Sequence, residues 1–334
     1  MFAQSKAKEG SDVQKIMKTL RKRMQSEGGF TLRKLAGKRA ACAVIALGMG
    51  LSLSSCSKKE TADVEGTTKL VITAIPDEKI SDQEAKFQAL GEYLHEKLDI
   101  PVEFSISKDY STSVQRFANG EVHLVWFGGL TGVQARALVP GSRAIAQGVE
   151  DPHFKSYFIA NVDTGLKPSV EFPMAIKDMS FTFGAANSTS GSLMPTFFIK
   201  EETGKYPKDF FSQPVQFQEA GGHVATAKAV ESGSVQTGVL NYATYDTMVK
   251  DGELDPEKAV IIWTTPEYAD YNLTVHPILD KSFGEGFIDK LQKALVECEK
   301  PEVLKAFNRE TLIPAKNEDF EGIEKVARDL DKLR

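Results

Sequence analysis

The order of hydrophobic and polar positions predicts strands that alternate with helices. An apolar run rich in β-branched residues, 70–75, is followed by a helix that begins near Ser81, where Glu84 completes a capping box. The same order continues with strands at 102–105 and 124–127 and helices at 113–118 and 131–138. Such alternation favours an α/β fold with a largely parallel sheet.

A second series of strands and helices follows and predicts a second lobe with its own sheet. Its strands are expected at 181–184, 215–218, 238–240 and 260–263, its helices at 192–200, 224–230 and 244–250, and more helix at 284–298, 303–307 and 320–333. Two extended segments, 157–161 and 271–275, are interpreted as crossovers that form a hinge. The prediction is therefore a two-lobed α/β protein, with 69–157 plus 272–334 in one lobe and 158–271 in the other. Ligands of such folds bind beyond the strand ends.

The first 55 residues have the features of an export signal. They hold eleven lysines and arginines against three acidic residues, a net charge of +8, whereas the whole chain carries −5. Basic residues at 33–39 precede an apolar stretch, 40–53, that is too short to span a bilayer. We expect this extension to be removed on export, and Met17 or Met24 is a possible alternative start. The acidic remainder does not favour nucleic-acid binding.

Cys56 is predicted to carry a lipid anchor. The sequence Leu53-Ser54-Ser55-Cys56 resembles the bacterial lipobox, and the polar residues from Cys56 to Thr68 read as a flexible tether. The alternative is an ordinary signal peptide with a chance cysteine. Because Cys42 lies in the removed segment, Cys298 remains alone in the mature body and no intramolecular disulfide is expected.

The run 187–191, Asn-Ser-Thr-Ser-Gly, is the strongest candidate for a binding site. It lies between a predicted strand and a predicted helix, so Ser188, Thr189 and Ser190 would present hydroxyls beside free backbone N–H groups at a helix N-terminus. Such a position binds oxyanions. The alternative is ordinary helix capping, for which serine and threonine are also preferred.

Other loops at predicted strand ends supply further candidates: Tyr110, Trp126, Phe127, Gly128, His223, Asn241 and Tyr242, with Tyr271 at the second crossover. Each has a structural alternative, since the Trp-Phe pair suits a central strand, glycines suit turns, and the tyrosines suit a surface or hinge. These loops offer few charges. We therefore expect neutral hydroxyl, amide and imidazole groups to hold the ligand reversibly.

The sequence gives little sign of catalysis. It contains no nucleophile elbow, P-loop lysine, dinucleotide fingerprint or H-E-x-x-H motif. A nucleophilic Ser188 or Ser190 would have His223 as its only candidate base, and the five histidines have no metal-ligand spacing. We predict a protein that is not an enzyme and that needs no cofactor or metal.

Several of these runs, in this order, resemble the phosphate/phosphite/phosphonate-binding proteins of ABC importers: Asp109-Tyr110, Trp126 to Gly129, Asn187 to Gly191 and Gly222-His223. Within that family, 74–78, 188–195, 264–272 and 313–316 are most similar to the subgroup described as putative selenate-binding proteins. The resemblance implies a type 2 periplasmic-binding fold, with the anion on Ser188, Thr189 and Ser190 and contacts from Tyr110 and His223.

Two departures from the family pattern affect the ligand. Val224 stands where phosphonate binders often have an acidic residue that can hold an amine, which disfavours aminoalkylphosphonates, and Phe127 lacks the hydroxyl of the usual tyrosine. Phosphate, phosphite and phosphonate can carry a proton near pH 7 and need an acceptor, whereas sulfate and selenate need donors only. The carboxylates that could supply the acceptor are Asp77, Glu78, Asp109 and Asp270.

The expected function is that of an exported, lipid-anchored, monomeric binding protein that captures a small tetrahedral oxyanion, selenate-like or phosphonate/phosphite-like. It would deliver the anion to an ABC permease and its ATPase. The alternative is an extracytoplasmic sensor lipoprotein that signals to a membrane partner.

Overall fold

The computed structural model describes residues 67–77 and 80–333, all of them within one compact unit, Thr61–Arg334. The predictions for the export signal, for Cys56 and for most of the tether lie outside these residues. Within the described ranges, no helix combines the length and the apolar character that a membrane span requires.

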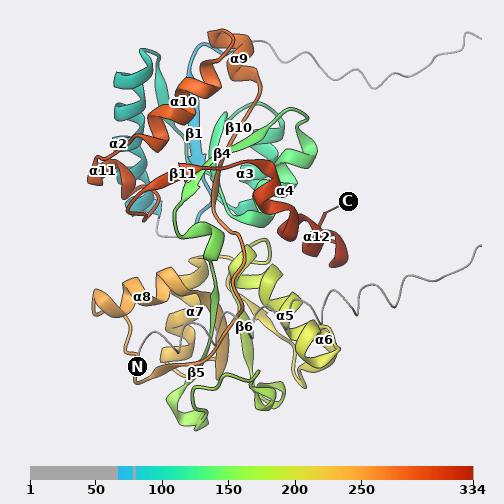
Figure 1. Ribbon diagram of the computed structural model, residues 1–334. Coiled ribbons are helices and arrows are strands. Elements are labelled where there is room, and N and C mark those ends of the chain that lie inside the picture. The colour runs from blue at the N-terminus through green and yellow to red at the C-terminus, as the bar shows by residue number, and fades with distance from the viewer. Residues whose placement is uncertain (1–66, 78–79, 334) are drawn as a thin grey trace, which may run out of the picture. The chain divides into compact units, whose positions relative to one another are not determined.

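Six strands form the first sheet, in the order β11-β4-β10-β3-β1-β2 (Figure 1). They are β1 (Leu70–Ala74), β2 (Val102–Phe104), β3 (Leu124–Phe127), β4 (Arg143–Gly148), β10 (Asn272–Val275) and β11 (Leu312–Pro314). The helices of this part are α2 (Ile80–Leu98), α3 (Tyr110–Ala118), α4 (Gly129–Leu138), α9 (Ile278–Phe283), α10 (Phe287–Val296), α11 (Pro301–Leu304) and α12 (Glu321–Asp329). Every residue of β1 and β3 is buried, because helices cover the sheet.

Five strands form the second sheet, in the order β7-β6-β8-β5-β9. They are β5 (Ser156–Asn161), β6 (Phe181–Phe183), β7 (Gln216–Phe217), β8 (Thr237–Asn241) and β9 (Ala259–Thr264), with helices α5 (Met194–Thr203), α6 (Pro207–Phe210), α7 (Gly222–Glu231) and α8 (Tyr242–Lys250). Short helical turns are η1 (Asp151–His153), η2 (Val162–Thr164), η3 (Met174–Asp178) and the π-helical η4 (Thr189–Leu193), and η5 (Asn317–Phe320) precedes α12. The core beside the second sheet contains the rings of Phe158, Phe172 and Trp263, which pack edge to face.

Both sheets are mixed, so the prediction of a largely parallel sheet is wrong. Among the strand pairings of the described residues, four are parallel and five are antiparallel. Strand β10 runs antiparallel to β3 and β4, and β5 runs antiparallel to β8 and β9. These two strands arrive from the other sheet, and they do not follow the helical connections that force parallel pairing.

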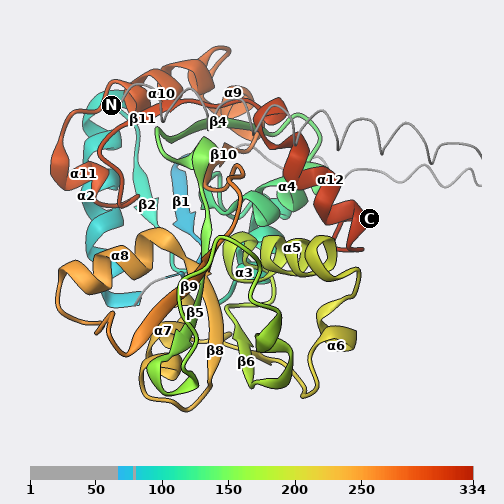
Figure 2. The same ribbon diagram turned by 60° about the horizontal axis from the view of Figure 1, so that its bottom comes forward.

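The crossovers also lie elsewhere than predicted. The segments 157–161 and 271–275 are extended, but they belong to β5 and β10 inside the sheets. The chain passes between the sheets through 149–155 and 265–271, and the two segments pair where Phe154 and Tyr268 exchange N–H···O bonds of 2.9 Å (Figure 2). We call these segments the first and the second crossover.

The C-terminal part differs from the prediction in one further way. The helix expected at 284–298 is present but shorter, because α10 begins at Phe287 and ends at Val296, and α9, which ends at Phe283, was not predicted. Gly284 and Gly286 lie between them with φ of 98° and 80°, which side chains rarely adopt. Strands β4 and β11 were not predicted, and Cys298 is a buried free thiol, as expected.

Two buried histidines lie next to each other, His123 directly before β3 and His276 directly after β10. The ring of His276 packs on the ring of Phe117, with 5.2 Å between the centroids, and its Nδ1 accepts from the Ile278 N–H. The backbone N–H of His276 donates to the backbone carbonyl of His123. Burial, together with the charge of a protonated His123, lowers the pKa of His276 to about 4, and burial also lowers the pKa of His123. Both rings are therefore neutral in the folded protein near pH 7.

We predict that the free energy of unfolding attributable to His276 falls as pH decreases from about 6.5 to about 4. In this window the unfolded chain binds a proton at residue 276 and the folded chain does not, so the free energy of unfolding falls by roughly 1 kcal/mol per pH unit. His276→Asn keeps an acceptor for Ile278 and removes the titration, so it should lower stability at pH 7.5 but reduce the further loss at pH 5, measured by urea unfolding. Phe117→Leu, the control, should lose stability about equally at both pH values. An acid loss in His276→Asn as large as that of the unmodified protein would contradict this prediction.

Candidate functional site

The run 187–191 forms a tight turn between β6 and α5. The Gly184 N–H donates to the Gly191 carbonyl over 2.9 Å, and a Cβ on Gly191 would lie only 3.1 Å from the Gly184 Cα, so both positions need glycine. Ser188 accepts from the Gly191 N–H over 3.0 Å. The capping interpretation is therefore correct for Ser188, and the hydroxyl-bearing residues of the run are all at most 3% exposed.

The start of α4 meets this run from the other sheet. The Gly129 N–H donates to Asp270 Oδ1 over 2.8 Å, and the Leu130 N–H donates to Thr189 Oγ1 over 3.0 Å. A Cβ on Gly128 would lie 3.0 Å from Thr189 Oγ1 and 3.2 Å from Asp270 Oδ1. Two helical N-termini and one carboxyl group thus converge at one buried point, which concentrates N–H donors and positive partial charge.

Asp270 is the acidic group at this point. Its residue is 1% exposed, and burial raises its pKa to about 7 although hydrogen bonds from Gly129 and Thr189 favour the charged form. Its second oxygen, Oδ2, is buried and has no partner among the described residues. Near neutral pH this carboxyl group can therefore either accept a proton or donate one to a neighbour.

His223 supplies a neutral donor beside the run. Its ring is 1% exposed, and burial lowers its pKa to about 4. The Asn241 N–H donates to Nδ1 over 3.3 Å, which assigns the ring proton to Nε2. That Nε2 is buried without a partner in the described part of the chain, and the ring adjoins Gly191. An unpaired buried N–H is costly unless a ligand accepts from it.

Tyr110 approaches the run from the first turn of α3. Its side chain is buried, its hydroxyl is hydrogen-bonded to Ser188, and burial raises its pKa well above the ordinary value. At the exposed edge, Asn187 Nδ2 donates to Ser111 Oγ over 2.8 Å. Helix α3 and the run therefore contact each other through two side-chain bonds.

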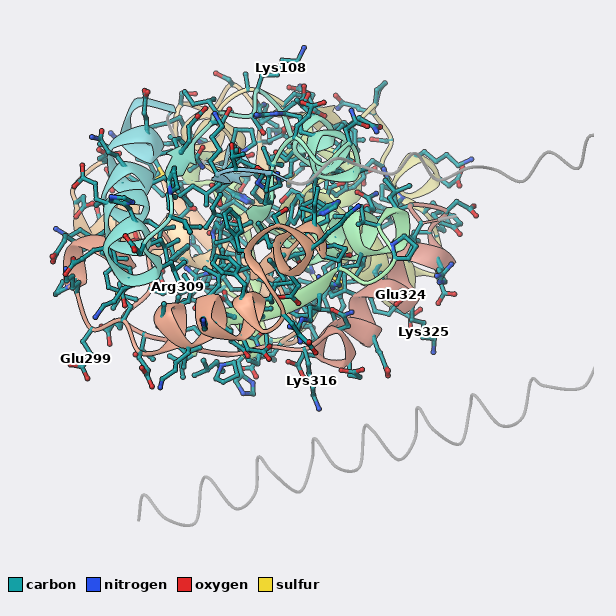
Figure 3. All side chains as sticks on the ribbon, turned by 90° about the horizontal axis from the view of Figure 1, so that it is seen from above. Lys108, Glu299, Arg309, Lys316, Glu324 and Lys325 are labelled. Atoms are coloured by element: carbon teal, nitrogen blue, oxygen red, sulfur yellow. The ribbon has the colours of Figure 1, made fainter. Side chains whose placement is uncertain are left out.

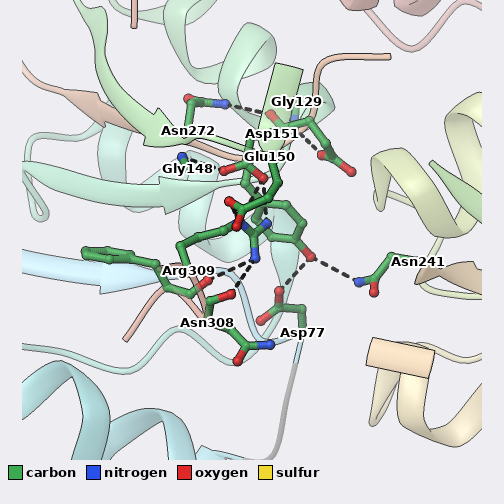
Figure 4. Close-up of polar contacts among 12 residues, drawn as sticks. Asp77, Gly129, Gly148, Glu150, Asp151, Asn241, Asn272, Asn308 and Arg309 are labelled. Carbon is green, nitrogen blue, oxygen red and sulfur yellow. Dashed lines mark hydrogen bonds and ion pairs between the residues drawn. The ribbon is translucent and has the colours of Figure 1, made fainter. Parts of the chain in front are cut away.

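A small cavity of about 60 Å³ lies beside the crossovers. The rings of Trp126 and Tyr271 stack in its wall at 5.3 Å. The Tyr271 hydroxyl donates to Asp77 Oδ2 over 2.7 Å and accepts from Asn241 Nδ2 over 3.4 Å (Figure 4). Because Asn241 also contacts His223 through its backbone, a chain of hydrogen bonds connects the cavity wall with the buried donors.

Three sequence candidates have other positions. Phe127 is fully buried in the core, with its ring edge-to-face on Phe117, because β3 is covered on both sides. Tyr242 packs on Phe154 and beneath Lys155, at the first crossover. Asp109 caps α3 by accepting from the Thr112 N–H. Glu78 lies outside the described residues.

A buried arginine outside the predicted loops lies beside the cavity. Arg309, whose side chain is 5% exposed, lines the cavity and forms an ion pair with the buried Asp151. Nothing in the sequence marks this arginine, which follows α11 in a polar stretch and has no characteristic spacing to Asp151. Asp270 could be named from the sequence only as one of several carboxylates.

The arrangement places several neutral donors near one buried carboxyl group. The donors are the hydroxyls of Ser188, Thr189, Ser190 and Tyr110 and the His223 N–H, and the acceptor is Asp270. Among residues 67–77 and 80–333, no group of three histidine, cysteine or acidic side chains is placed to hold a metal ion.

Comparisons with known proteins show which family the chain resembles. The family model described as "ABC transporter, phosphonate, periplasmic substrate-binding protein" matches residues 72–320. A probable ABC transporter phosphite binding protein, PhnD1, of Prochlorococcus marinus MIT 9301 is 34% identical over 272 residues, which are 79% of this chain and 91% of that protein. The structure of PhnD1 in complex with methylphosphonate has a TM-score of 0.74 at 33% identity and covers 80% of this chain and 99% of that one. A phosphate-import protein, PhnD, of Mycolicibacterium smegmatis is 28% identical over 264 residues, 75% of this chain and 78% of the other.

We predict that Thr189→Val destabilises the protein by about 1–2 kcal/mol. The valine fits the space but leaves the buried Leu130 N–H at the start of α4 without its acceptor. Thr189→Ser keeps the oxygen and serves as the matched control, with a smaller loss. Urea unfolding of both variants measures the difference, and equal losses would show that the hydrogen bond contributes nothing.

Proposed function

Because this chain belongs to the family of periplasmic substrate-binding proteins of phosphonate ABC transporters, we propose that it captures a small phosphorus oxyanion able to carry a proton near neutral pH. The fold is that of the type 2 periplasmic binding proteins, and its homologues are binding proteins of ABC transporters rather than enzymes. The ligand would lie between the two sheets, on the buried donors described above, and pass from there to an ABC permease and its ATPase.

The buried carboxyl group of Asp270 is the observation that carries the choice of ligand. A phosphite or phosphonate monoanion has one P–OH group that donates to a carboxylate, and the dianion accepts from the protonated acid. In both cases one proton lies between the ligand and Asp270. The unpaired Oδ2 and a pKa of about 7 fit this exchange.

Fully ionised anions fit less well. Sulfate and selenate have no proton to donate, so Asp270 would have to be protonated before they could bind. We therefore propose phosphite or a small phosphonate rather than selenate. The names of the relatives support this choice, since PhnD1 is described as phosphite-binding and its structure contains methylphosphonate.

The remaining donors favour reversible capture. His223 offers one neutral N–H, and the hydroxyls of Ser188, Thr189, Ser190 and Tyr110 are neutral as well. Neutral dipoles stabilise an anion without a permanent cation in contact with it, so the complex does not become too tight to release.

We predict that Asp270→Asn reverses the preference among anions. The amide cannot accept a ligand proton while its oxygen faces Gly129, so affinity for the monoanions of phosphite and methylphosphonate should fall about tenfold or more. Its N–H₂ group can donate to fully ionised anions, so affinity for sulfate and selenate should rise. Isothermal titration calorimetry with all four anions at pH 6, where the phosphorus ligands are largely monoanions, measures the change.

Asp178→Asn is the control, because this carboxylate is exposed beside Lys177, and it should leave all four affinities unchanged. Selenate binding tighter than phosphite in the unmodified protein, with no change of preference in Asp270→Asn, would reject the proposed ligand class.

We further propose that the protein is exported and anchored to the membrane through a lipid on Cys56. The basis is the basic, apolar and small-residue order before this cysteine, which is the order of a lipoprotein signal. The polar tether after it would hold the binding unit beside its permease.

For the anchor we predict that Cys56→Ser moves the protein from the membrane fraction to the soluble fraction of expressing bacteria, while metabolic labelling with a fatty-acid analogue disappears. Cys298→Ser, which leaves the lipobox intact, is the control. Labelling that persists in Cys56→Ser would place the lipid elsewhere or exclude it.

A further inference from the structure

Arg309 is a buried arginine whose ion-pair partner, Asp151, is hydrogen-bonded to Asp270 at the proposed anion site. Figure 3 shows Lys108 and Lys316 projecting from the outer edge of the molecule, whereas Arg309 lies within it. Its side chain is 5% exposed and its guanidinium lies over three aromatic rings, those of Tyr271 at 5.1 Å, Phe154 at 5.5 Å and Trp126 at 5.7 Å. These rings come from both crossovers and from β3.

The guanidinium is held in one orientation by hydrogen bonds. Nε donates to Asp151 Oδ1 over 3.1 Å, Nη2 donates to the same oxygen over 2.5 Å, and Nη1 donates to the carbonyls of Phe307 and Asn308 (Figure 4). Asp151 is completely buried, and its other oxygen accepts from the Gly148 N–H over 2.6 Å. Burial opposes the charge of Arg309, but the attraction of Asp151 outweighs it, so the pKa of Arg309 is raised further.

Gly148 makes this arrangement possible. A Cβ at this position would lie 2.5 Å from Arg309 Cδ and 2.7 Å from Asp151 Oδ2, closer than atoms approach in real structures. The end of β4, the first crossover and the segment after α11 therefore meet at a point with no room for a side chain at residue 148.

The ion pair is connected to the anion site through one backbone bond. The carbonyl of Asp151 accepts from the Asp270 N–H over 3.1 Å, which joins the first crossover to the second. The side chain of Asp270 then reaches Gly129 and Thr189. The path Arg309–Asp151–Asp270 thus runs from a cation that lines the cavity to the carboxyl group at the start of α4.

We propose that Arg309 is a positioning residue for ligand capture. By holding the Asp151 side chain in place and compensating its negative charge, Arg309 fixes the position of the Asp270 carboxyl group and the electrostatic potential around it. This inference rests on the proposed function for its binding readout, but the state of Asp270 can be followed without any ligand. It assigns Arg309 no contact with the anion.

The groups that face Asp270 predict how its protonation responds to substitution. Gly129, Thr189 and Ser190 donate to it, and Asp151 repels its negative charge. Tyr110, Tyr268 and Tyr271 face it as buried neutral phenols, Asp77 lies beyond Tyr271, and Glu150 lies 3.8 Å from Arg309 Nε. Burial raises the pKa of Asp151, and Arg309 opposes this rise. Without Arg309, Asp151 is charged only above its raised pKa, and there its uncompensated charge disfavours ionisation of Asp270. Without the Asp151 charge the effect reverses.

The test compares Arg309→Gln with Asp151→Asn in the otherwise unchanged protein. The titration of Asp270 is followed by infrared difference spectroscopy of its carboxyl group, with Asp270→Asn as the spectral reference and no ligand present. We expect the Asp270 midpoint to move to higher pH in Arg309→Gln and to lower pH in Asp151→Asn, each by about half a pH unit or more. Arg143→Gln, which removes an exposed arginine paired with Asp289, is the matched control and should leave the midpoint unchanged.

A second arm uses Arg309→Lys, which keeps the positive charge but loses the planar, multiply bonded geometry. Its Asp270 midpoint should stay close to that of the unmodified protein, while the affinity for methylphosphonate falls about tenfold because the crossovers are held less rigidly. A purely structural arginine would lower the melting temperature in all variants without shifts of opposite sign.

Midpoints that move in the same direction, or not at all, in Arg309→Gln and Asp151→Asn overturn the inference. If Arg309→Gln does not fold, a downward shift in Asp151→Asn together with the binding loss in Arg309→Lys supports it, and an unchanged midpoint in Asp151→Asn rejects it. A third outcome separates the two proposals. If the variants show the expected shifts of the Asp270 midpoint but the unmodified protein binds neither methylphosphonate nor phosphite, the proposed function is rejected and this inference stands.

Discussion

The burial of the Asp270 carboxyl group where two helical segments begin is the constraint on which the site depends. A carboxylate that is 1% exposed is costly unless donors surround it, and the Gly129 N–H and the Thr189 hydroxyl do so from opposite sheets. The same bonds join α4 to the run 187–191. A single acidic residue therefore contacts both parts and, under the proposed function, also the ligand, and a side chain at residue 128 would crowd this contact.

The protonation states of Asp270 and His223 complement each other. Burial and the charge of Asp151 raise the pKa of the acid to about 7, and burial lowers the pKa of the imidazole to about 4, so near neutral pH the imidazole is neutral and the acid is partly protonated. Under the proposed function, an incoming anion meets neutral donors and shares one proton with Asp270. Selectivity would then depend on the position of that proton, which distinguishes phosphorus oxyanions from sulfur and selenium oxyanions of similar size.

The alternation of strands and helices, the position of the serine-rich run and the family resemblance were available from the sequence, because each is a local pattern of residues. The mixed direction of the sheets was not, since β5 and β10 look like any other extended apolar segment and only their partners define their direction. Local patterns also placed Phe127 in the ligand site, although a strand covered on both faces sends that ring into the core. Arg309 and Asp151 are 158 residues apart, and no spacing rule connects them.

The location of the buried Arg309 guanidinium is consistent with a proposed site that is itself neutral. A cation in contact with a dianion would add strong, poorly reversible binding, and a carrier must release its ligand. Arg309 instead contacts the two segments that connect the sheets. Its ion pair with Asp151 compensates its positive charge, so little of that charge acts at the proposed ligand position. The ion pair thus lies where the chain crosses between the sheets, the polar donors lie where we propose that the anion binds, and one backbone hydrogen bond between Asp151 and Asp270 connects the two.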